Sequence, residues 1–167
     1  MDNEFNQIFD IMAEAFPESE YRSYEEQKKL LLKDFYKIIS YKDKGNNVIA
    51  FMSYWQFNDF AFVEHLAINK DYRGKGIGSK LLREFIENNE KKLVILEVEL
   101  PRDEISRKRI RFYEKLGFNL NLYPYEQLPL RIEFNNIPMY IMSYPRKINE
   151  SEFMEIKAKL HRDVYKA

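Results

Sequence analysis

Apolar residues recur along the chain with two different spacings, and each change of spacing falls near a turn signal or a proline. Helical spacing, with apolar positions three or four residues apart, occurs at residues 5–16, 23–32, 77–86, 105–116 and 153–164. Strand-like runs of β-branched and aromatic residues occur at residues 36–41, 48–56, 60–68, 93–100, 118–125 and 139–144. Residues 44–47, Lys-Gly-Asn-Asn, form a hairpin turn, so the two runs beside it should pair antiparallel. The pattern predicts an α+β chain.

The third strand-like run, residues 60–68, carries polar residues among apolar ones. Strict alternation would place Glu64 on one face together with Leu66 and Ile68, and His65 on the opposite face. We therefore expect His65 to be a packed or hydrogen-bonded histidine.

Length and composition narrow the class of protein. At 167 residues the chain is long enough for one well-buried core, so we expect a single domain over residues 1–167. The 27 basic and 27 acidic residues cancel, which argues against nucleic acid as a partner. No cysteine and only two histidines are present, so we expect no metal site. The acidic start, Asp2 and Glu4, and the lack of a long apolar run predict a cytoplasmic protein without membrane contact.

Three glycines alternate at Gly74, Gly76 and Gly78, between a strand-like run and an amphipathic helix. Glycine lets successive backbone N–H groups turn to one side, and the helix adds its own unpaired N–H groups and the positive end of its dipole. Together these groups form a nest for phosphate. The side chains of Arg73 and Lys75 can add cationic contacts to a diphosphate.

Two other phosphate-binding motifs also place glycines after a strand, and the residues here can be compared with both. A dinucleotide-binding fingerprint requires Gly-x-Gly-x-x-Gly directly after a strand, but Ser79 occupies the third glycine position and five residues intervene. Glu97 lies roughly where the ribose-binding acid would stand, so this alternative remains open. A Walker-type loop requires a glycine where the chain has Asn69, which excludes it. A tight turn without a ligand is the remaining alternative.

Arg73, Gly76 and Gly78 match Arg/Gln-x-x-Gly-x-Gly/Ala, the acetyl-CoA signature of the GCN5-related N-acetyltransferases, the GNAT superfamily. Residues 65–72 resemble the family's fourth strand and its lead-in to the loop, and residues 112–118 resemble its aromatic-Tyr-x-Lys-Leu-Gly-Phe segment. Two separated motifs thus agree in order, and the chain resembles this superfamily.

The resemblance implies the GNAT fold: α/β/α layers around a mixed, mostly antiparallel sheet of six to seven strands, flanked by helices. The family's fourth and fifth strands should splay into a V that admits the pantetheine arm of acetyl-CoA. The implied contacts to acetyl-CoA are Leu66, Ala67, Ile68, Arg73, Gly74, Lys75, Gly76, Ile77, Gly78 and Ser79.

The resemblance also implies the reaction, which is acetyl transfer from acetyl-CoA to a primary amine by direct attack in a ternary complex. A charged amine must lose a proton first, and Glu64 is the leading candidate for the base, with Glu97 second. Tyr113 matches the family's tyrosine that protonates the departing thiolate. A backbone N–H near Ala67 or Ile68 should stabilise the carbonyl oxygen.

Several questions stay open at the level of sequence. The chain has Ser106 and Arg109 where the family's helix often has Asn and Ala, so the resemblance does not extend to the family's CoA contact there. The acceptor can be an antibiotic, a polyamine, an amino acid, a peptide N-terminus or a lysine side chain, and a homodimer is open. A module that binds acetyl-CoA without turnover is the alternative function, and a nicotinamide-dependent oxidoreductase is a third.

Overall fold

In the computed structural model, which describes residues 2–166, helices and strands follow the order expected from the sequence. The helices are α1 (Asp2–Ala15), α2 (Tyr24–Lys29), α3 (Ile77–Glu87), α4 (Glu104–Lys115) and α5 (Glu150–Lys159). The strands are β1 (Tyr36–Lys42), β2 (Val48–Gln56), β3 (Phe60–Ile68), β4 (Leu93–Glu99), β5 (Asn119–Gln127) and β6 (Ile137–Tyr144). Short helical turns are η1 (Glu18–Glu20), η2 (Leu30–Leu32), η3 (Lys70–Tyr72) and the π-type η4 (Leu160–Val164).

The strands form one six-stranded sheet in the order β1-β2-β3-β4-β6-β5. Only the central pair β3 and β4 is parallel, and all other neighbours are antiparallel. The expected mixed, mostly antiparallel sheet is therefore confirmed, with six strands in residues 2–166.

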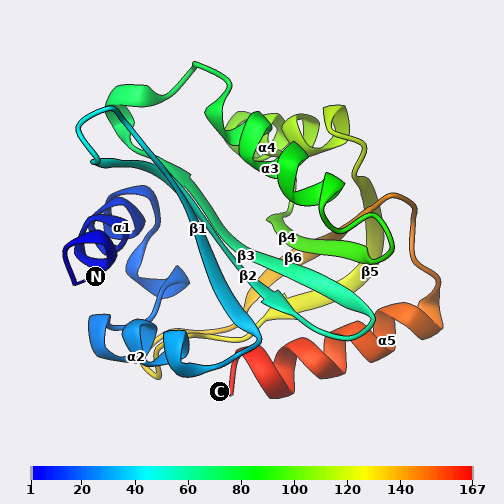
Figure 1. Ribbon diagram of the computed structural model, residues 1–167. Coiled ribbons are helices and arrows are strands. Elements are labelled where there is room, and N and C mark those ends of the chain that lie inside the picture. Colours follow the sequence, from blue (N-terminus) through cyan, green and yellow to red (C-terminus); the bar gives the residue numbers. More distant parts are fainter. Residues whose placement is uncertain (1, 167) are drawn as a thin grey trace.

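Helices cover both faces of the sheet (Figure 1). On the face that we call the α3 face, α3 and α4 pack through residues such as Leu81, Phe85 and Ile110. On the opposite α5 face, α1 packs through Met12, and α5 packs through Phe153 and its neighbours. This arrangement gives the expected α/β/α layers.

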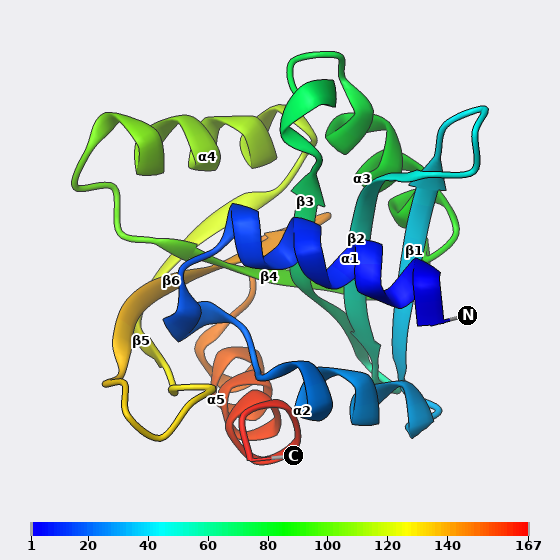
Figure 2. The same cartoon turned by 90° about the vertical axis from the view of Figure 1, so that its left-hand side faces the viewer.

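The sheet splits at its centre. β3 and β4 pair only over four positions, from Phe60 with Leu93 to Val63 with Leu96. Beyond these positions β3 rises toward the glycine loop while β4 runs off to the side (Figure 2). The predicted V between these two strands is confirmed, and it opens at Glu64 on one strand and Glu97 on the other.

A β-bulge at Glu64 contradicts the strict alternation expected for residues 60–68. Ser53 pairs with His65 but the next residue of β2 pairs with Val63, so Glu64 is an extra residue on β3. Glu64 and His65 therefore both point to the α5 face, whereas Leu66 packs on the α3 face. The prediction that Glu64 shares a face with Leu66 was wrong, because one inserted residue reverses the alternation.

The second predicted helix is shorter than residues 23–32. Ser23 caps α2 in a capping box with Glu26, as the Ser-x-x-Glu pattern indicates, but the helix ends at Lys29 and continues as the 3₁₀ turn η2. The closing helix likewise ends at Lys159 and continues as the π-type turn η4.

Replacement of Gly117 tests the packing of α4 against the sheet. Gly117 follows the C-terminus of α4 with φ of +98°, and a Cβ there would lie 2.9 Å from Tyr144 Cε2. We expect Gly117→Ala to lower the free energy of unfolding by about 2–3 kcal/mol in denaturant titrations, because backbone strain and a steric clash add.

Gly74→Ala is the matched control for that measurement. Gly74 also has positive φ, at +79°, but no atom lies within 4 Å of the place that its Cβ would take, so only the backbone strain of about 1 kcal/mol should appear. Equal losses in the two variants would contradict the clash with Tyr144.

Candidate active site

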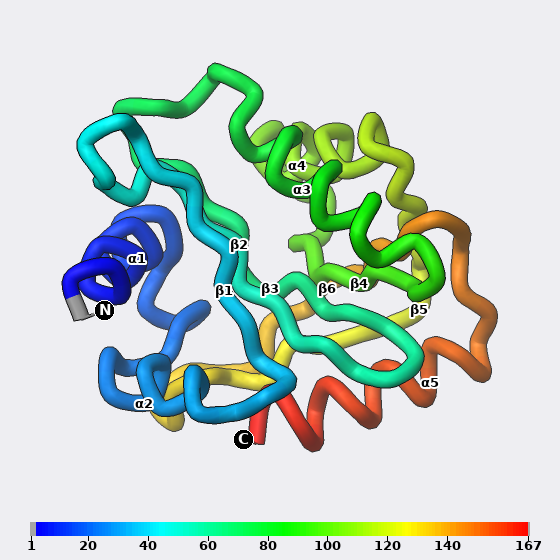
Figure 3. Tube along the Cα trace, in the orientation of Figure 1, coloured from blue at the N-terminus to red at the C-terminus, as the bar shows by residue number. Residues whose placement is uncertain are grey.

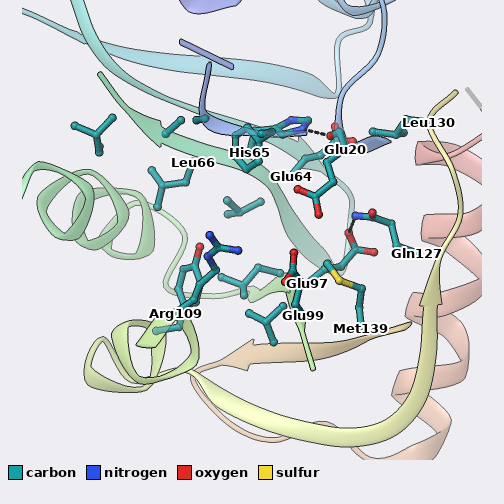
Figure 4. A pocket seen from close by; sticks show the side chains of 18 of the residues that line it. Glu20, Glu64, His65, Leu66, Glu97, Glu99, Arg109, Gln127, Leu130 and Met139 are labelled. Atoms are coloured by element: carbon teal, nitrogen blue, oxygen red, sulfur yellow. Dashed lines mark hydrogen bonds between the residues drawn. The ribbon is translucent and has the colours of Figure 1, made fainter. Parts of the chain in front are cut away.

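A cavity of about 440 Å³ occupies the split between β3 and β4. Residues 63–68 of β3 and 96–99 of β4 form its two walls, and α4 contributes Arg109 and Tyr113. Figure 4 shows Glu20, Glu64, Glu97 and Glu99 around this space. Of the predicted site residues, Glu64, Leu66, Ala67, Ile68, Arg73, Glu97 and Tyr113 line the cavity, whereas Gly74, Lys75, Gly76, Ile77, Gly78 and Ser79 do not.

The cavity passes through the sheet, and different types of side chain line its two sides. Glu64 and Glu97 contact side chains of the α5 face, such as Trp55 and Tyr125. Tyr113 packs on the α3 face, together with Leu66 and Ile68. One molecule could therefore enter from each face and meet its partner in the split.

The glycine loop leads from β3 to α3 (Figure 3). Gly74 and Gly76 have φ of +79° and +76°, and no atom lies within 4 Å of where a Cβ would stand on either residue. The first backbone bond of α3 runs from Lys80 N–H to Gly76 O at 3.1 Å. The N–H groups of residues 77–79 are consequently the unpaired donors of the first helical turn. An open backbone surface and these donors fit a diphosphate.

The two cationic side chains of the loop, Arg73 and Lys75, contact other residues of the protein. Arg73 donates to Ile68 O at 3.2 Å and forms an exposed ion pair with Glu14 at 2.6 Å. Lys75 Nζ lies 5.2 Å from the centre of the Tyr72 ring. The backbone therefore offers the more direct contact to a phosphate group in this arrangement.

Glu64 is buried in an ion pair. Arg22 Nη1 lies 3.2 Å from Glu64 Oε1 and 3.1 Å from Oε2, and Trp55 Nε1 donates to Oε1 at 2.9 Å. Burial alone would raise the pKa of Glu64, but the Arg22 charge and these hydrogen bonds lower it below the ordinary value. A carboxylate held in this way is a weak proton acceptor.

Glu97 is buried on the opposite wall. Gln127 Nε2 donates to its Oε1 at 3.0 Å, and the hydroxyls of Tyr125 and Tyr165 donate to its two oxygens. Burial raises the pKa of Glu97, and the three hydrogen bonds offset only part of the rise. Oε1 accepts two of these bonds and Oε2 accepts one, so Oε2 alone keeps a site for a new donor.

Tyr113 lies on α4 at the α3-face side of the cavity. Burial raises the pKa of its phenol, against an opposing effect of the Arg109 charge. The hydroxyl therefore stays protonated at neutral pH, which is the form that a proton donor needs.

His65 is buried and hydrogen-bonded, as expected, although it shares a face with Glu64. Its Nε2 lies 2.7 Å from Glu20 O, and Nδ1 lies 3.3 Å from Ser53 Oγ. Since a carbonyl only accepts, Nε2 carries the proton and Nδ1 accepts from Ser53. Burial lowers the pKa of His65, so the ring is neutral at pH 7.

Four charged residues that line the cavity were missed in the sequence, namely Glu14, Glu20, Glu99 and Arg109. Glu14, near the end of α1, forms the ion pair with Arg73. Glu99 could have been found, because it alternates with Glu97 along β4. Glu20 lies in the irregular turn η1, which carries no periodic signal. Arg109 stood out only as a departure from the family's pattern, and it lies across the cavity from these carboxylates.

Two further observations concern residues 2–166 alone. No group of three or more His, Asp or Glu side chains within residues 2–166 is arranged to hold a metal ion. Within the same range, no helix combines the length and apolar character needed to cross a membrane.

Comparisons with known proteins identify the family. The model of the Acetyltransferase (GNAT) family matches residues 5–118. Over 164 residues the chain is 30% identical to "Putative acetyltransferase YjbC" of Bacillus subtilis (strain 168), covering 94% of this chain and 80% of that protein. The solved structure of a "Putative acetyltransferase from GNAT family" from Bacteroides thetaiotaomicron matches with a TM-score of 0.89 and 31% identity, covering 98% of this chain and 92% of that one.

A more distant structure carries the ligand that the glycine loop suggests. An aminoglycoside 6'-N-acetyltransferase complexed with coenzyme A matches with a TM-score of 0.62 and 16% identity, over 86% of this chain and 93% of that one. Its likeness concerns the fold alone. Because the family model spans most of the chain and a relative at 30% identity matches 94% of this chain and 80% of its own length, the chain belongs to the GNAT acetyltransferase family.

Proposed function

We propose that this GNAT acetyltransferase transfers the acetyl group of acetyl-CoA to a primary amine by direct attack within the split between β3 and β4. The observation that carries the proposal is the cavity itself, which joins the two sheet faces where the strands stop pairing. Acetyl-CoA would supply the activated acetyl thioester. The amine would enter from the α5 face, where carboxylates line the wall.

The loop and the edge of β3 would hold the co-substrate. Backbone N–H groups of residues 77–79, beside Gly74 and Gly76, would bind the diphosphate. Leu66, Ala67 and Ile68 line the cavity beyond Val63, the last residue at which β3 pairs with β4. On the side facing β4, their backbone groups are therefore placed to pair with an extended pantetheine arm.

Tyr113 would donate the proton that the thiolate needs, since its phenol is protonated and lines the cavity on the α3 face. The role of a glutamate base stays a prediction for both Glu64 and Glu97. The Arg22 ion pair weighs against Glu64, and the three hydrogen bonds to Glu97 weigh against direct proton transfer to it.

Substitution of Tyr113 separates an enzyme from a module that only binds acetyl-CoA. We expect Tyr113→Phe to lower kcat for thiol release by about 100-fold, because it removes a positioned acid. Its affinity for acetyl-CoA in calorimetry should stay within about 3-fold of the wild type, since the ring still packs. The assay would use spermine, kanamycin, free lysine and an alanine-terminated peptide as acceptors.

Tyr54→Phe is a matched control on the same α3 face, because Tyr54 packs against Phe85 with the ring centres 4.6 Å apart but does not line the cavity. Its kcat should be close to that of the wild type. A wild-type protein that binds acetyl-CoA and releases no thiol with any of these amines would support the binding module instead.

A further inference from the structure

The backbone around Glu20 is fixed by three different segments. The N–H of Glu20 donates to Pro17 O at 2.9 Å, and its C=O accepts from His65 Nε2 at 2.7 Å (Figure 4). The next carbonyl, of Tyr21, accepts from Arg131 Nε at 2.9 Å, and the Arg131 guanidinium lies 4.8 Å from the centre of the Tyr21 ring. The side chain of Glu20 is thereby held at the wall of the cavity.

The groups that face Glu20 come from several elements. From β4, Glu99 and Glu97 place negative charges near it. From α4, Arg109 opposes them with a positive charge, and the β3 residue His65 is neutral. Burial, followed by the charge of Glu99, raises the pKa of Glu20 to about 7.

The other carboxylates on this side are engaged. Glu64 is ion-paired with Arg22, and both oxygens of Glu97 accept hydrogen bonds. Glu20 differs from them because, within residues 2–166, no hydrogen bond or ion pair engages its side chain, and burial and the charge of Glu99 raise its pKa. Once ionised, its carboxylate oxygens can accept a proton from a ligand.

A further buried acceptor belongs to Glu64, which lines the same cavity. Glu64 Oε2 accepts no hydrogen bond from the described residues, although Arg22 Nη1 lies 3.1 Å away and the Glu64 side chain is 3% exposed. This oxygen is sealed from the cavity, but Glu20, Glu97 and Glu99 also line the wall and attract a positively charged group. This chemistry matches an amine that arrives with its positive charge.

We propose that Glu20 is the group that takes the proton from the ammonium of the acceptor, and that Glu99 and His65 position it. The inference rests on the proposed acetyltransferase function. An enzyme that works near neutral pH is best served by a base that is partly ionised there.

Glu20 and Tyr113 together account for every proton that moves in the reaction. An ammonium loses two protons on becoming an amide. The first passes to the Glu20 carboxylate and then to solvent, which leaves the neutral amine. As the N–C bond forms and the C–S bond breaks, Tyr113 protonates the sulfur, and the second amine proton replaces the one that Tyr113 gave.

The test is a set of pH profiles of thiol release with spermine, kanamycin, lysine and an alanine-terminated peptide as probes. In the wild type, kcat/KM should rise with pH through about 7. Glu20→Gln should lower the maximum about 100-fold. Glu99→Gln should move the acidic limb of the profile about one pH unit lower, because it removes a negative charge beside Glu20. The exposed Glu18→Gln, from the same turn, should leave the profile unchanged.

A second measurement needs no amine. Because folding raises the pKa of Glu20 from 4.5 to about 7, the wild type loses stability as pH rises through this window. The thermal midpoint of Glu20→Gln should therefore rise relative to the wild type between pH 5 and pH 8.

The outcomes separate this inference from the proposed function. Thiol release by the wild type together with an unchanged rate in Glu20→Gln, or a midpoint difference that does not vary with pH, would overturn the role of Glu20 alone. No thiol release by the wild type with any probe would overturn the acetyltransferase proposal and this inference with it.

Discussion

Replacing Arg22 by Ala should lower the free energy of unfolding by about 3–5 kcal/mol at pH 7, the largest effect on stability that we expect from a single substitution. Arg22 is 6% exposed and its partner Glu64 lies on β3. Its second nitrogen, Nη2, donates to Val164 O at 3.0 Å, so one guanidinium ties the C-terminal turn η4 to the centre of the sheet. Removing it leaves a buried carboxylate without a countercharge.

The pH dependence of this loss identifies its cause. In the wild type the folded-state pKa of Glu64 is lowered, so the ion pair stabilises the protein above pH 4.5 and the contribution is lost as pH falls through the folded-state pKa. Without Arg22, burial raises the pKa of Glu64, which is then protonated at mildly acidic pH. The penalty of Arg22→Ala should consequently shrink from pH 7 to pH 4 in denaturant titrations.

The double variant Arg22→Met with Glu64→Leu is the control. It replaces both charges by apolar side chains, so most of the stability lost in Arg22→Ala should return. A loss that is the same at pH 7 and pH 4, and that persists in the double variant, would mean that the packing of the arginine side chain and its bond to Val164 matter more than charge.

Substituting Gly76 by Asp should weaken acetyl-CoA binding by roughly 100-fold, about 2.7 kcal/mol, as measured by calorimetry. Gly76 has φ of +76°, which Asp and Asn tolerate better than other residues, and a Cβ there meets no other atom within 4 Å. The protein should therefore fold. The new carboxylate would stand where we place the diphosphate.

Gly76→Asn is the matched control because its side chain has nearly the same shape without the charge. We expect it to bind acetyl-CoA about 10-fold more tightly than Gly76→Asp, with a gap that narrows as salt is added. If both variants bound as the wild type does, the loop would be a structural turn without a phosphate contact.

Most of the fold followed from periodicity and turn residues. The hairpin between β1 and β2, the long run of β3 and the helix after the glycine loop all lie within a few residues of their predicted positions. Local signals of this kind act within a few residues and can be read from one sequence. The split between β3 and β4 came only from the family resemblance, since no local pattern shows where two strands stop pairing.

Only part of the candidate site could be predicted from the sequence. Motifs pointed to Tyr113, which lines the cavity, and to the loop before α3, whose role at the site stays a prediction. The bulge at Glu64 was missed, because an inserted residue depends on the pairing with β2 and leaves no trace in β3 itself. Glu20 was missed for a related reason. It reaches the cavity through a hydrogen bond to His65, which is 45 residues away along the chain.

We propose that backbone N–H groups of residues 77–79 and the open glycines before them hold the diphosphate of coenzyme A. Calorimetry of the wild type with acetyl-CoA and with S-acetylpantetheine, which lacks the diphosphate and nucleotide, tests it most directly. We expect acetyl-CoA to bind at least about 100-fold more tightly than the fragment, with an affinity that falls as salt rises. Equal affinities for the two compounds, or no binding of acetyl-CoA at all, would contradict the account.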